Sequence, residues 1–412
     1  MTRARRAVVA CAVAGLALRA AFGLLYWTGQ PLTHDEREYL ALARSLARGE
    51  GYRYPTDEPA PGTGQQFGRA PGYPAFLSTF IQPVPVDHVP PRVQIVQAVV
   101  GAAGILLIAG IAWRAGGPRS AVAAAAVSSL YPPLVWMPAY ALSETLFSSL
   151  ALGIALILAK SGSPLDPPAK KRTVSSFLAG GVLTGTAILV RPAMVFFLPL
   201  AALWMVARKA YGGAAVFVLA ATLVVVPWTL RNHHVYGRWI AVASEGGVTF
   251  WTGNHPLATG EGDLAANPDL KRAELAFRAA HPGLTPEQLE PYYYRDALAW
   301  IRSDPGAWLG LTARKALYTV VPLGPSYAVH SSRYVAASVV PYALVLAAAI
   351  AGARRARGTS GRHAMEPLWL MAASTVLAGL IFFPQERFRL PVIDPALIVT
   401  AALIWSEHTQ DR

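Results

Sequence analysis

Charged residues and cysteines are scarce in this chain. Of its 412 residues, 14% are charged, 54% have apolar side chains, and a single residue, Cys11, is a cysteine. This composition excludes a typical soluble enzyme. The lone cysteine excludes an intrachain disulfide. The sequence also has no G-x-G-x-x-G or Walker A motif, so no nucleotide cofactor is predicted from it.

Long apolar runs recur along the chain instead. About 20 apolar residues in a helix cross the hydrocarbon core of a bilayer. The sequence therefore predicts an all-α polytopic membrane protein with about ten spans. The predicted spans are Ala7–Trp27, Val93–Trp113, Ala121–Trp136, Ala141–Ala159, Ser175–Val190, Ala193–Ala207, Gly213–Leu230, Val335–Ala353, Met365–Phe383 and Leu390–Trp405. The third and sixth are short, so we expect either to be tilted or re-entrant.

The positions of the basic residues predict the orientation. If the N-terminus is cytoplasmic, most arginines and lysines of the short connections fall on the cytoplasmic side. Both termini are therefore expected in the cytoplasm, and the first span is interpreted as a retained anchor rather than a cleaved signal. The net charge of +13 then reflects topology, and no nucleic-acid partner is predicted. The excess of arginine over lysine suggests a GC-rich bacterial genome, and so a bacterial plasma membrane.

Two predicted outer segments are too long to be turns, residues 29–91 and 231–333. They divide the chain into an N-terminal transmembrane module (1–230), an extracytoplasmic cap (231–333) and C-terminal transmembrane helices (334–412). In the first segment, Thr33 and Glu36 predict a capping box that starts a helix in the membrane plane. The second segment predicts a small mixed cap, with a β-like stretch at Trp239–Ser244 and an interfacial stretch at Trp308–Val321.

Asp35 and Glu36 follow the first span, where a spanning helix meets water. Acids in the first turn of a helix interact favourably with its dipole, which is one interpretation of the pair. The other is catalytic, because an ionised carboxylate can take a proton from an incoming hydroxyl. The two interpretations are compatible.

Glu144 lies at the outer end of a predicted span. An ionisable group there is costly in lipid and usually faces the bundle or water. It is either a structural partner of Arg19 or Arg191, or a second acid that faces the Asp35 site.

Arg387 and Arg389 precede the last predicted span. Interfacial snorkelling is one interpretation. The other is a clamp on a lipid phosphate, because a guanidinium matches phosphate oxygens and stays charged. Arg191 and Arg69 are weaker candidates for the same task.

Several other polar residues have weaker signals. Arg19, in the middle of the first span, predicts a buried pair with an unknown partner. A metal site from His233, His234, His255 and Glu245 matches no known spacing, so a divalent metal stays open and no cofactor is assigned. The doublet Arg314-Lys315 is interpreted as contacting phospholipid headgroups.

In chain order, these pieces resemble the GT-C class of membrane glycosyltransferases. The branch they resemble contains bacterial relatives of the protein O-mannosyltransferase and lipid A aminoarabinose transferase family (glycosyltransferase family 39-like). The residues that carry the resemblance are Asp35-Glu36 with Tyr39, Ala43, Leu46, Gly49 and Gly51, then Arg69-x-Pro71-x-Tyr73-Pro74, Ser143-Glu144, Val190-Arg191-Pro192, Pro227-Trp228 with Arg231-Asn232, Gly253-Asn254, and Arg387-Phe388-Arg389-Leu390-Pro391. His255 departs from the pattern, since relatives often carry a second Asn there.

The resemblance implies a transferase that takes a sugar from a polyprenyl-phosphate donor on the outer face of the membrane. It assigns the catalytic carboxylate to Asp35, with Glu36 beside it, and the donor phosphate to Arg387 and Arg389. The acceptor is a glycan, a lipid or a protein. A transporter or flippase of lipid-linked sugars is the alternative, although paired broken helices at mid-membrane would then be expected.

Overall fold

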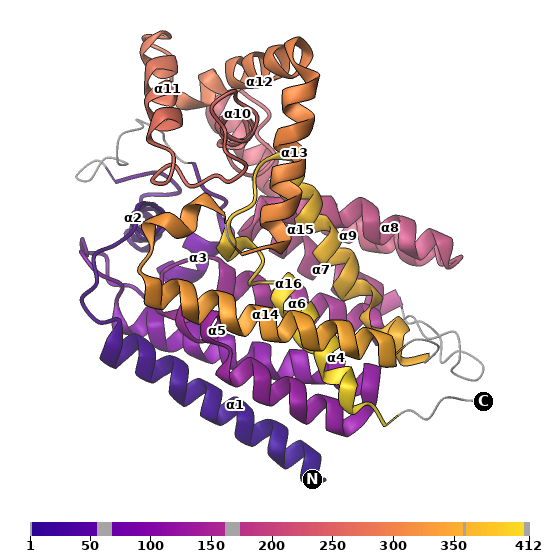
Figure 1. The fold of residues 1–412 in the computed structure, drawn as a ribbon. Helices are drawn as coiled ribbons and strands as arrows, with labels where there is room; N and C mark the ends of the chain where they lie inside the picture. The colour runs from indigo at the N-terminus through magenta and orange to yellow at the C-terminus, as the bar shows by residue number, and fades with distance from the viewer. Residues whose placement is uncertain (1, 56–67, 161–173, 323, 357–359, 408–412) are drawn as a thin grey trace.

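The computed structural model describes residues 2–55, 68–160, 174–322, 324–356 and 360–407, and these are helical or irregular throughout (Figure 1). The α-helices are α1 (Arg3–Ala21), α2 (His34–Ala47), α3 (Gly72–Ser78), α4 (Pro91–Leu130), α5 (Pro132–Trp136), α6 (Glu144–Lys160), α7 (Val174–Val190), α8 (Phe197–Ala207), α9 (Tyr211–Tyr236), α10 (Gly246–Gly253), α11 (Pro268–Ala279), α12 (Pro286–Ser303), α13 (Pro305–Val320), α14 (Ser332–Arg355), α15 (Glu366–Ile381) and α16 (Ile393–Ala402). Short 3₁₀ segments include η3 (Pro192–Phe196), η4 (Pro325–Val329) and η6 (Glu386–Phe388).

The prediction of a multi-pass membrane protein is confirmed. Within the described ranges, five helices are long and apolar enough to cross a membrane: Arg3–Tyr26, Pro91–Leu130, Tyr211–Tyr236, Ser332–Arg355 and His363–Ile381. Four shorter apolar helices lie among them: Glu144–Ala159, Val174–Val190, Pro192–Ala207 and Ile393–Trp405. The predicted total of about ten spans is therefore not established. Part of the basic set predicted to be cytoplasmic lies outside the described residues, namely Lys170, Lys171, Arg172, Arg357 and Arg412.

Two of the predicted spans belong to α4, which reverses its direction part-way along. Gly117 has φ of 85° and ψ of −172°, a backbone conformation that glycine adopts readily, and Pro118 follows it. The chain then runs back along the first arm. Gln97, near the start of α4, shows this, since its side-chain amide donates to the carbonyls of Pro138 and Tyr140, beyond the end of the helix, at 3.1 and 2.6 Å. The helix is therefore a hairpin of two antiparallel arms, and α1 packs along it.

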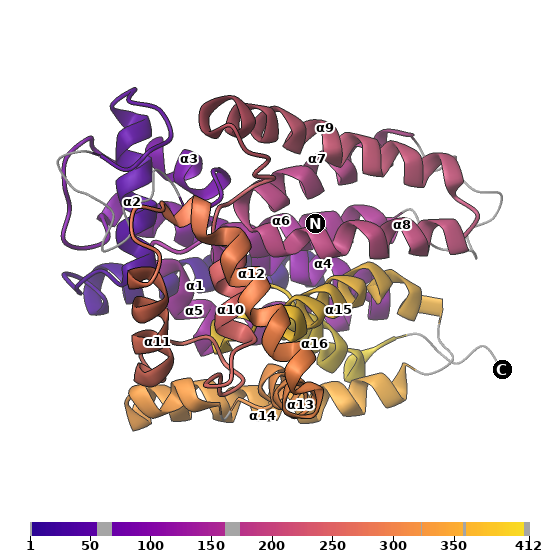
Figure 2. The ribbon, with the colours of Figure 1, turned by 90° about the horizontal axis from the view of Figure 1, so that it is seen from above.

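Helix α2 lies across the direction of the long helices, as the two perpendicular views show (Figures 1 and 2). The predicted capping box is present, and the helix is followed by Gly49 with φ of 74°. Charged side chains of this helix lie inside the protein: Glu38 and Arg44 are buried at 1% and 2% exposure. Helix α2 is therefore enclosed by protein, and its buried charges need partners.

Residues 231–333 form a helical assembly rather than the predicted mixed cap. The β-like stretch Trp239–Ser244 contains no strand, because its residues make no ladder with another described segment. Helices α10 to α13 instead share a small apolar core that includes Trp251, Leu270, Leu289 and Tyr293. Helix α13, which contains the predicted interfacial stretch, lies across the direction of α14 (Figures 1 and 2).

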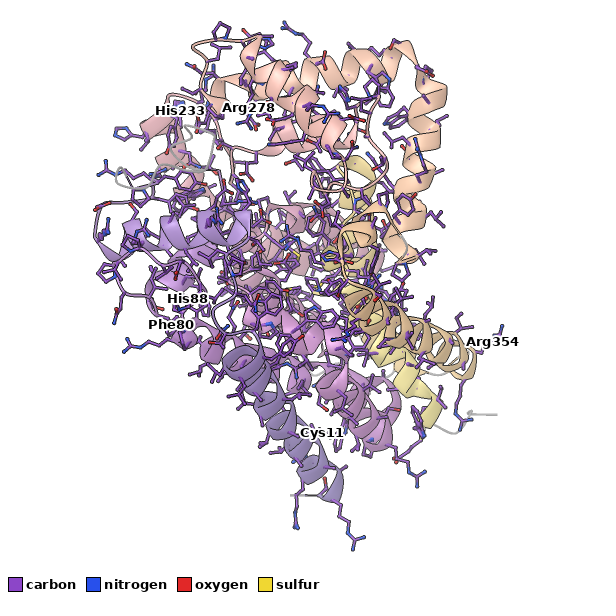
Figure 3. The ribbon with its side chains drawn as sticks, turned by 60° about the vertical axis from the view of Figure 1, so that its left-hand side comes forward. Cys11, Phe80, His88, His233, Arg278 and Arg354 are labelled. Atoms are coloured by element: carbon purple, nitrogen blue, oxygen red, sulfur yellow. The ribbon has the colours of Figure 1, made fainter. Side chains whose placement is uncertain are left out.

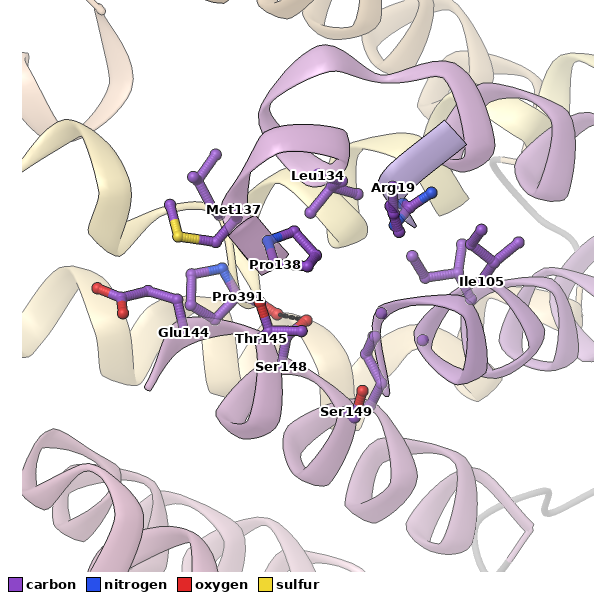
Figure 4. Close-up of a pocket in the computed structure, with 15 residues that line it drawn as sticks. Arg19, Ile105, Leu134, Met137, Pro138, Glu144, Thr145, Ser148, Ser149 and Pro391 are labelled. Atoms are coloured by element: carbon purple, nitrogen blue, oxygen red, sulfur yellow. Dashed lines mark hydrogen bonds between the residues drawn. The ribbon is translucent and has the colours of Figure 1, made fainter. Parts of the chain in front are cut away.

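The partner of Arg19 is the C-terminal end of a helix rather than an acidic side chain. Its guanidinium donates to the carbonyls of Ser128 and Ser129 at 2.9 and 3.4 Å, in the last turn of α4. Carbonyls there lack intrahelical partners and carry the negative end of the helix dipole. Figure 4 shows the small cavity between Arg19 and Glu144, and the Glu144 carboxylate points away from Arg19. The interpretation of Glu144 as a partner of Arg19 is therefore wrong.

Candidate active site

A cavity of about 850 Å³ lies between the membrane helices and the α10–α13 assembly. One part of its wall is charged and comes from α2, the segment before α3, the start of α6 and the segment 384–389. Another part is apolar and comes from η3 and α15, with Met194, Val195, Phe196, Met371, Ala378 and Phe382. The cavity therefore offers one surface to polar groups and another to hydrocarbon.

Asp35 lies in the charged wall and is bound by two arginines. Its Oδ1 accepts a hydrogen bond from Arg69 Nη2 at 2.6 Å, and its Oδ2 accepts one from Arg387 Nη2. Burial alone would raise the pKa of Asp35, but the charges of Arg69 and Arg387 outweigh it and hold that pKa well below its usual range. Asp35 and Arg387 are 352 positions apart in the sequence, and the structure brings them into contact.

Arg69 joins three carboxylates. Besides Asp35, its Nε donates to Glu38 Oε2 at 2.6 Å, and its Nη1 lies 3.5 Å from Glu245 Oε2. The guanidinium carbon also lies 5.4 Å from the centre of the Tyr39 ring. These contacts place Arg69 at the centre of the charged wall, and its role as a weaker candidate for the donor phosphate stays a prediction.

Glu144 and Arg191 form a second ion pair beside the first. Arg191 Nη1 lies 2.8 Å from Glu144 Oε1, and Arg387 Nε lies 3.7 Å from the same oxygen. Arg191 also contacts the face of the Phe388 ring. Arg387 therefore lies between Asp35 and Glu144, and all four residues line the cavity.

Two predicted site residues face elsewhere. Glu36 is 2% exposed, and one carboxylate oxygen accepts hydrogen bonds from the amide and hydroxyl of Thr33, both at 2.8 Å. Its other oxygen accepts from the Ala141 amide at 2.9 Å. Arg389 reaches the cavity wall but is 3% exposed, and its Nε lies 3.3 Å from Asp394 Oδ1. Glu36 and Arg389 are thus held by protein groups.

The sequence analysis did not single out Glu38 and assigned Glu245 only to a metal set. A signal for Glu38 was present, since residues three apart on a helix share a face, and Asp35 and Glu38 have that spacing. No local pattern predicts that Glu245 meets Arg69, because the two lie in different outer segments.

Within the described ranges, no group of three or more His, Cys, Asp and Glu side chains is arranged to hold a metal ion. The histidines of the predicted set are separated. His233 packs on the Trp239 ring and His255 on the Trp251 ring, at 4.0 and 4.2 Å between centroids. They do not converge on Glu245, so the predicted ligand set is wrong.

Asn254 and Lys315 join the α10–α13 assembly to the end of α15. The Lys315 Nζ donates to Asn254 Oδ1 at 3.0 Å and to the Leu380 carbonyl at 3.1 Å. The Asn254 amide donates to the Ile381 carbonyl at 2.8 Å. Lys315 is fully buried, so its interpretation as a headgroup contact is wrong. The segment that carries Arg387 begins directly after this junction.

No family model matches this sequence, and no curated protein does either. Among solved structures, the chain is similar to the oligosaccharyltransferase of Archaeoglobus fulgidus tethered to an acceptor peptide with the NVT sequon. The TM-score is 0.58 at 13% identity, over 97% of this chain and 49% of that one. The same archaeal enzyme, AglB, in complex with an inhibitory peptide and a dolichol-phosphate gives 0.57 at 12%, over 97% and 50%.

A third structure, ArnT of Cupriavidus metallidurans bound to undecaprenyl phosphate, gives a TM-score of 0.43 at 14% identity, over 93% of this chain and 77% of that one. That likeness is too loose to carry an argument. The similarity to the archaeal enzyme shows that the two share a fold, and the chain spans about half the length of that enzyme. The branch predicted from the motifs stays a prediction.

Proposed function

We propose that this protein is a glycosyltransferase that moves a sugar from a polyprenyl-phosphate donor to an acceptor hydroxyl on the outer face of the plasma membrane. The observation that carries the proposal is the position of Asp35 in a cavity wall, bound by Arg69 and Arg387 and close to an apolar surface. A lipid-linked sugar needs both surfaces, because its chain stays in hydrocarbon while its phosphate and sugar are polar.

The arginines of the cavity wall can bind the phosphate of the donor as it separates from the sugar. Arg387 now donates to Asp35, and an arriving phosphate diester competes for the same guanidinium through bidentate hydrogen bonds. Arg69 and Arg191 lie beside it and can stabilise the charge that develops on the phosphate. The same exchange releases Asp35 Oδ2, which then accepts a proton.

The reaction balances without a cofactor. The acceptor oxygen attacks the anomeric carbon, the bond from that carbon to the phosphate oxygen breaks, and polyprenyl phosphate leaves with the electron pair. Asp35 takes the hydroxyl proton as the new bond forms. A single in-line displacement of this kind inverts the anomeric centre.

The fold is consistent with this chemistry. The archaeal enzyme that shares it has been solved with a dolichol-phosphate and, separately, with an acceptor peptide. Its acceptor peptide contains an NVT sequon, so peptides belong among the acceptors to be tested alongside glycans and lipids.

The test is incubation of membranes with labelled polyprenyl-phosphate sugars, followed by identification of the labelled product. Wild type should transfer label, and Asp35→Asn, which keeps the side-chain shape, should lose about 100-fold or more in rate. Arg387→Lys keeps the charge but removes the planar fork, so it should raise the KM for the donor.

The matched control is Arg48→Lys, since Arg48 lies at the far end of α2, outside the cavity lining. Near-normal turnover in Asp35→Asn would remove the catalytic role of that residue. Movement of the lipid-linked sugar across the membrane without product would favour a transporter.

A further inference from the structure

Four of the carboxylates that line the cavity contact Arg69 or Arg387, and they differ in how firmly they are held. A fifth, Glu274, is paired with Lys271 and Arg278. The side chains of Glu38 and Glu144 are 1% and 3% exposed, whereas those of Asp35 and Glu245 are 20% and 24% exposed. Both oxygens of Asp35 accept hydrogen bonds from arginines. The contact of Glu245 is with Arg69 Nη1, at 3.5 Å, and no hydrogen bond to its carboxylate is found within the described ranges. Glu245 is therefore the least constrained carboxylate of the cavity.

Glu245 and Asp35 lie on neighbouring nitrogens of one guanidinium. Asp35 Oδ1 contacts Arg69 Nη2, and Glu245 Oε2 lies opposite Nη1. The two carboxylates come from different parts of the structure, Asp35 from α2 and Glu245 from the residue before α10. Both side chains therefore contact the same guanidinium and line the same cavity.

The charges around Glu245 favour its protonated form. Burial raises its pKa to about 7, Arg69 opposes this, and the carboxylates of Glu38, Asp35 and Glu290 add to it. Other titratable groups near it are the hydroxyls of Tyr52 and Tyr54, whose pKa values are raised by burial. A carboxyl group with this pKa changes its protonation near pH 7.

We infer that Glu245 is a second proton acceptor of the reaction and receives the acceptor's proton from Asp35. The inference rests on the proposed function. Asp35 takes the proton while the phosphate occupies Arg387, but its carboxyl group cannot hold a proton at neutral pH once Arg387 returns to it. The proton therefore passes through a bridging hydroxyl or water to a Glu245 oxygen and from there to solvent. One proton enters Glu245 and one leaves in each turnover, and no other reactant is needed.

The pH dependence of turnover tests this inference. In wild type, Glu245 already carries a proton below about pH 7 and cannot accept another, so kcat should fall about tenfold per pH unit as the pH decreases below that value. In Glu245→Gln, kcat should be about 100-fold lower and should show no such decline between pH 6 and 8. Glu245→Asp should restore turnover together with the decline.

Glu290→Gln is the matched control. Burial also raises the pKa of Glu290 to about 7, yet this residue lies on α12 outside the cavity lining. It accepts a hydrogen bond from the Gly247 amide at 3.0 Å, which a glutamine oxygen can also accept. The decline in acid should therefore remain in this variant, displaced to a lower pH because one of the carboxylates that raise the pKa of Glu245 is removed.

A readout independent of activity is infrared titration. Wild type and Glu290→Gln should both show the infrared band of a protonated carboxyl group that disappears near pH 7. The part of this band that comes from Glu245 should be missing in Glu245→Gln. If wild type transfers sugar and Glu245→Gln keeps the same rate and the same acid decline, the role of Glu245 is overturned while the proposed function stands. If wild type transfers no sugar from any polyprenyl-phosphate donor, the proposed function fails first.

Discussion

Asp35 and Glu36 are adjacent acids with different surroundings. Successive residues of a helix point about 100° apart, so Asp35 and Glu36 lie on different sides of α2. Asp35 faces Arg387, while Glu36 faces Thr33 and the Ala141 amide. The capping interpretation therefore describes Glu36, and the catalytic interpretation is kept for Asp35 as a proposal.

This difference predicts opposite outcomes for two amide substitutions. Glu36→Gln should retain near-normal transfer, because glutamine completes a capping box and still accepts from Ala141. Glu36→Ala should lower the free energy of unfolding by about 1–3 kcal/mol, since the buried Ala141 amide loses its acceptor. Thermal unfolding in detergent and the transfer assay measure the two effects. A large loss of transfer in a stably folded Glu36→Gln would return Glu36 to the active site.

Arg387 and Arg389 also differ in their surroundings, although they are only two residues apart in the sequence. Arg389 lies against the fully buried Asp394, which also accepts from Tyr131 at 2.8 Å. Arg389→Ala should therefore lower stability by about 3–5 kcal/mol, because an unpaired carboxylate stays buried. Arg387→Ala should reduce transfer with a smaller loss of stability. Equal unfolding temperatures for the two variants would contradict this assignment.

The sequence indicated several of these residues, but not which partner each would take. Asp35, Glu144, Arg191 and Arg387 were found because charged groups at span ends are expensive and need neighbours. Their pairing depends on contacts between residues up to 352 positions apart, which no local periodicity encodes.

At the scale of elements, the junction between α10 and α15 determines where Arg387 lies. A Cβ added at Gly253 would lie 1.8 Å from the Phe382 carbonyl oxygen, so the two backbones approach too closely for any side chain. Asn254 and Lys315 fix the same end of α15 through hydrogen bonds to carbonyls. This junction gives the Gly253-Asn254 motif a structural role.

Gly253→Ala should therefore displace the segment that begins at Phe382. We expect lower transfer, a higher KM for the donor and a lower unfolding temperature, because the backbone must shift to relieve the clash. Gly310→Ala on α13 is the control, since a Cβ there meets nothing within 4 Å and alanine favours a helix by about 0.5–1 kcal/mol. Wild-type kinetics in Gly253→Ala would contradict the role of the junction.

Element prediction succeeded where the signal was local. The predicted capping box of Thr33 and Glu36 is present at the start of α2. The β-like stretch at Trp239–Ser244 failed because alternating side chains do not make a strand without a partner strand.

For the whole molecule, the predicted orientation has a direct test. Cys11 is the single cysteine, so a Cys11→Ala background accepts one new thiol at a chosen place. Arg272 is an exposed residue of α11, and Arg354 is exposed at the far end of α14, as Figure 3 shows for Arg354. In intact cells, a membrane-impermeant maleimide should label Arg272→Cys and should leave Arg354→Cys unlabelled until the cells are permeabilised.

Labelling of Arg354→Cys alone in intact cells would invert the topology and place the cavity in the cytoplasm. The proposed use of a donor on the outer face would then be wrong, whereas the contacts around Asp35 would be unaffected. The class of the whole molecule, a polytopic membrane protein, was predictable from the sequence, since apolar runs indicate spans and basic connections indicate their orientation. The two arms of α4 were predicted as the separate spans Val93–Trp113 and Ala121–Trp136, and the structure places the reversal between them, at Gly117.

The burial of Arg19 has a consequence for how the protein is made. Its acceptor at Ser128 is 109 residues further along the chain, so α1 leaves the ribosome long before that carbonyl exists. An arginine at mid-helix costs about 2.5–3.5 kcal/mol on insertion. A nascent chain that stops after α1 should therefore integrate poorly, and one that extends past Tyr131 should integrate well. The first helix of this protein depends on the completed hairpin for its place in the bilayer.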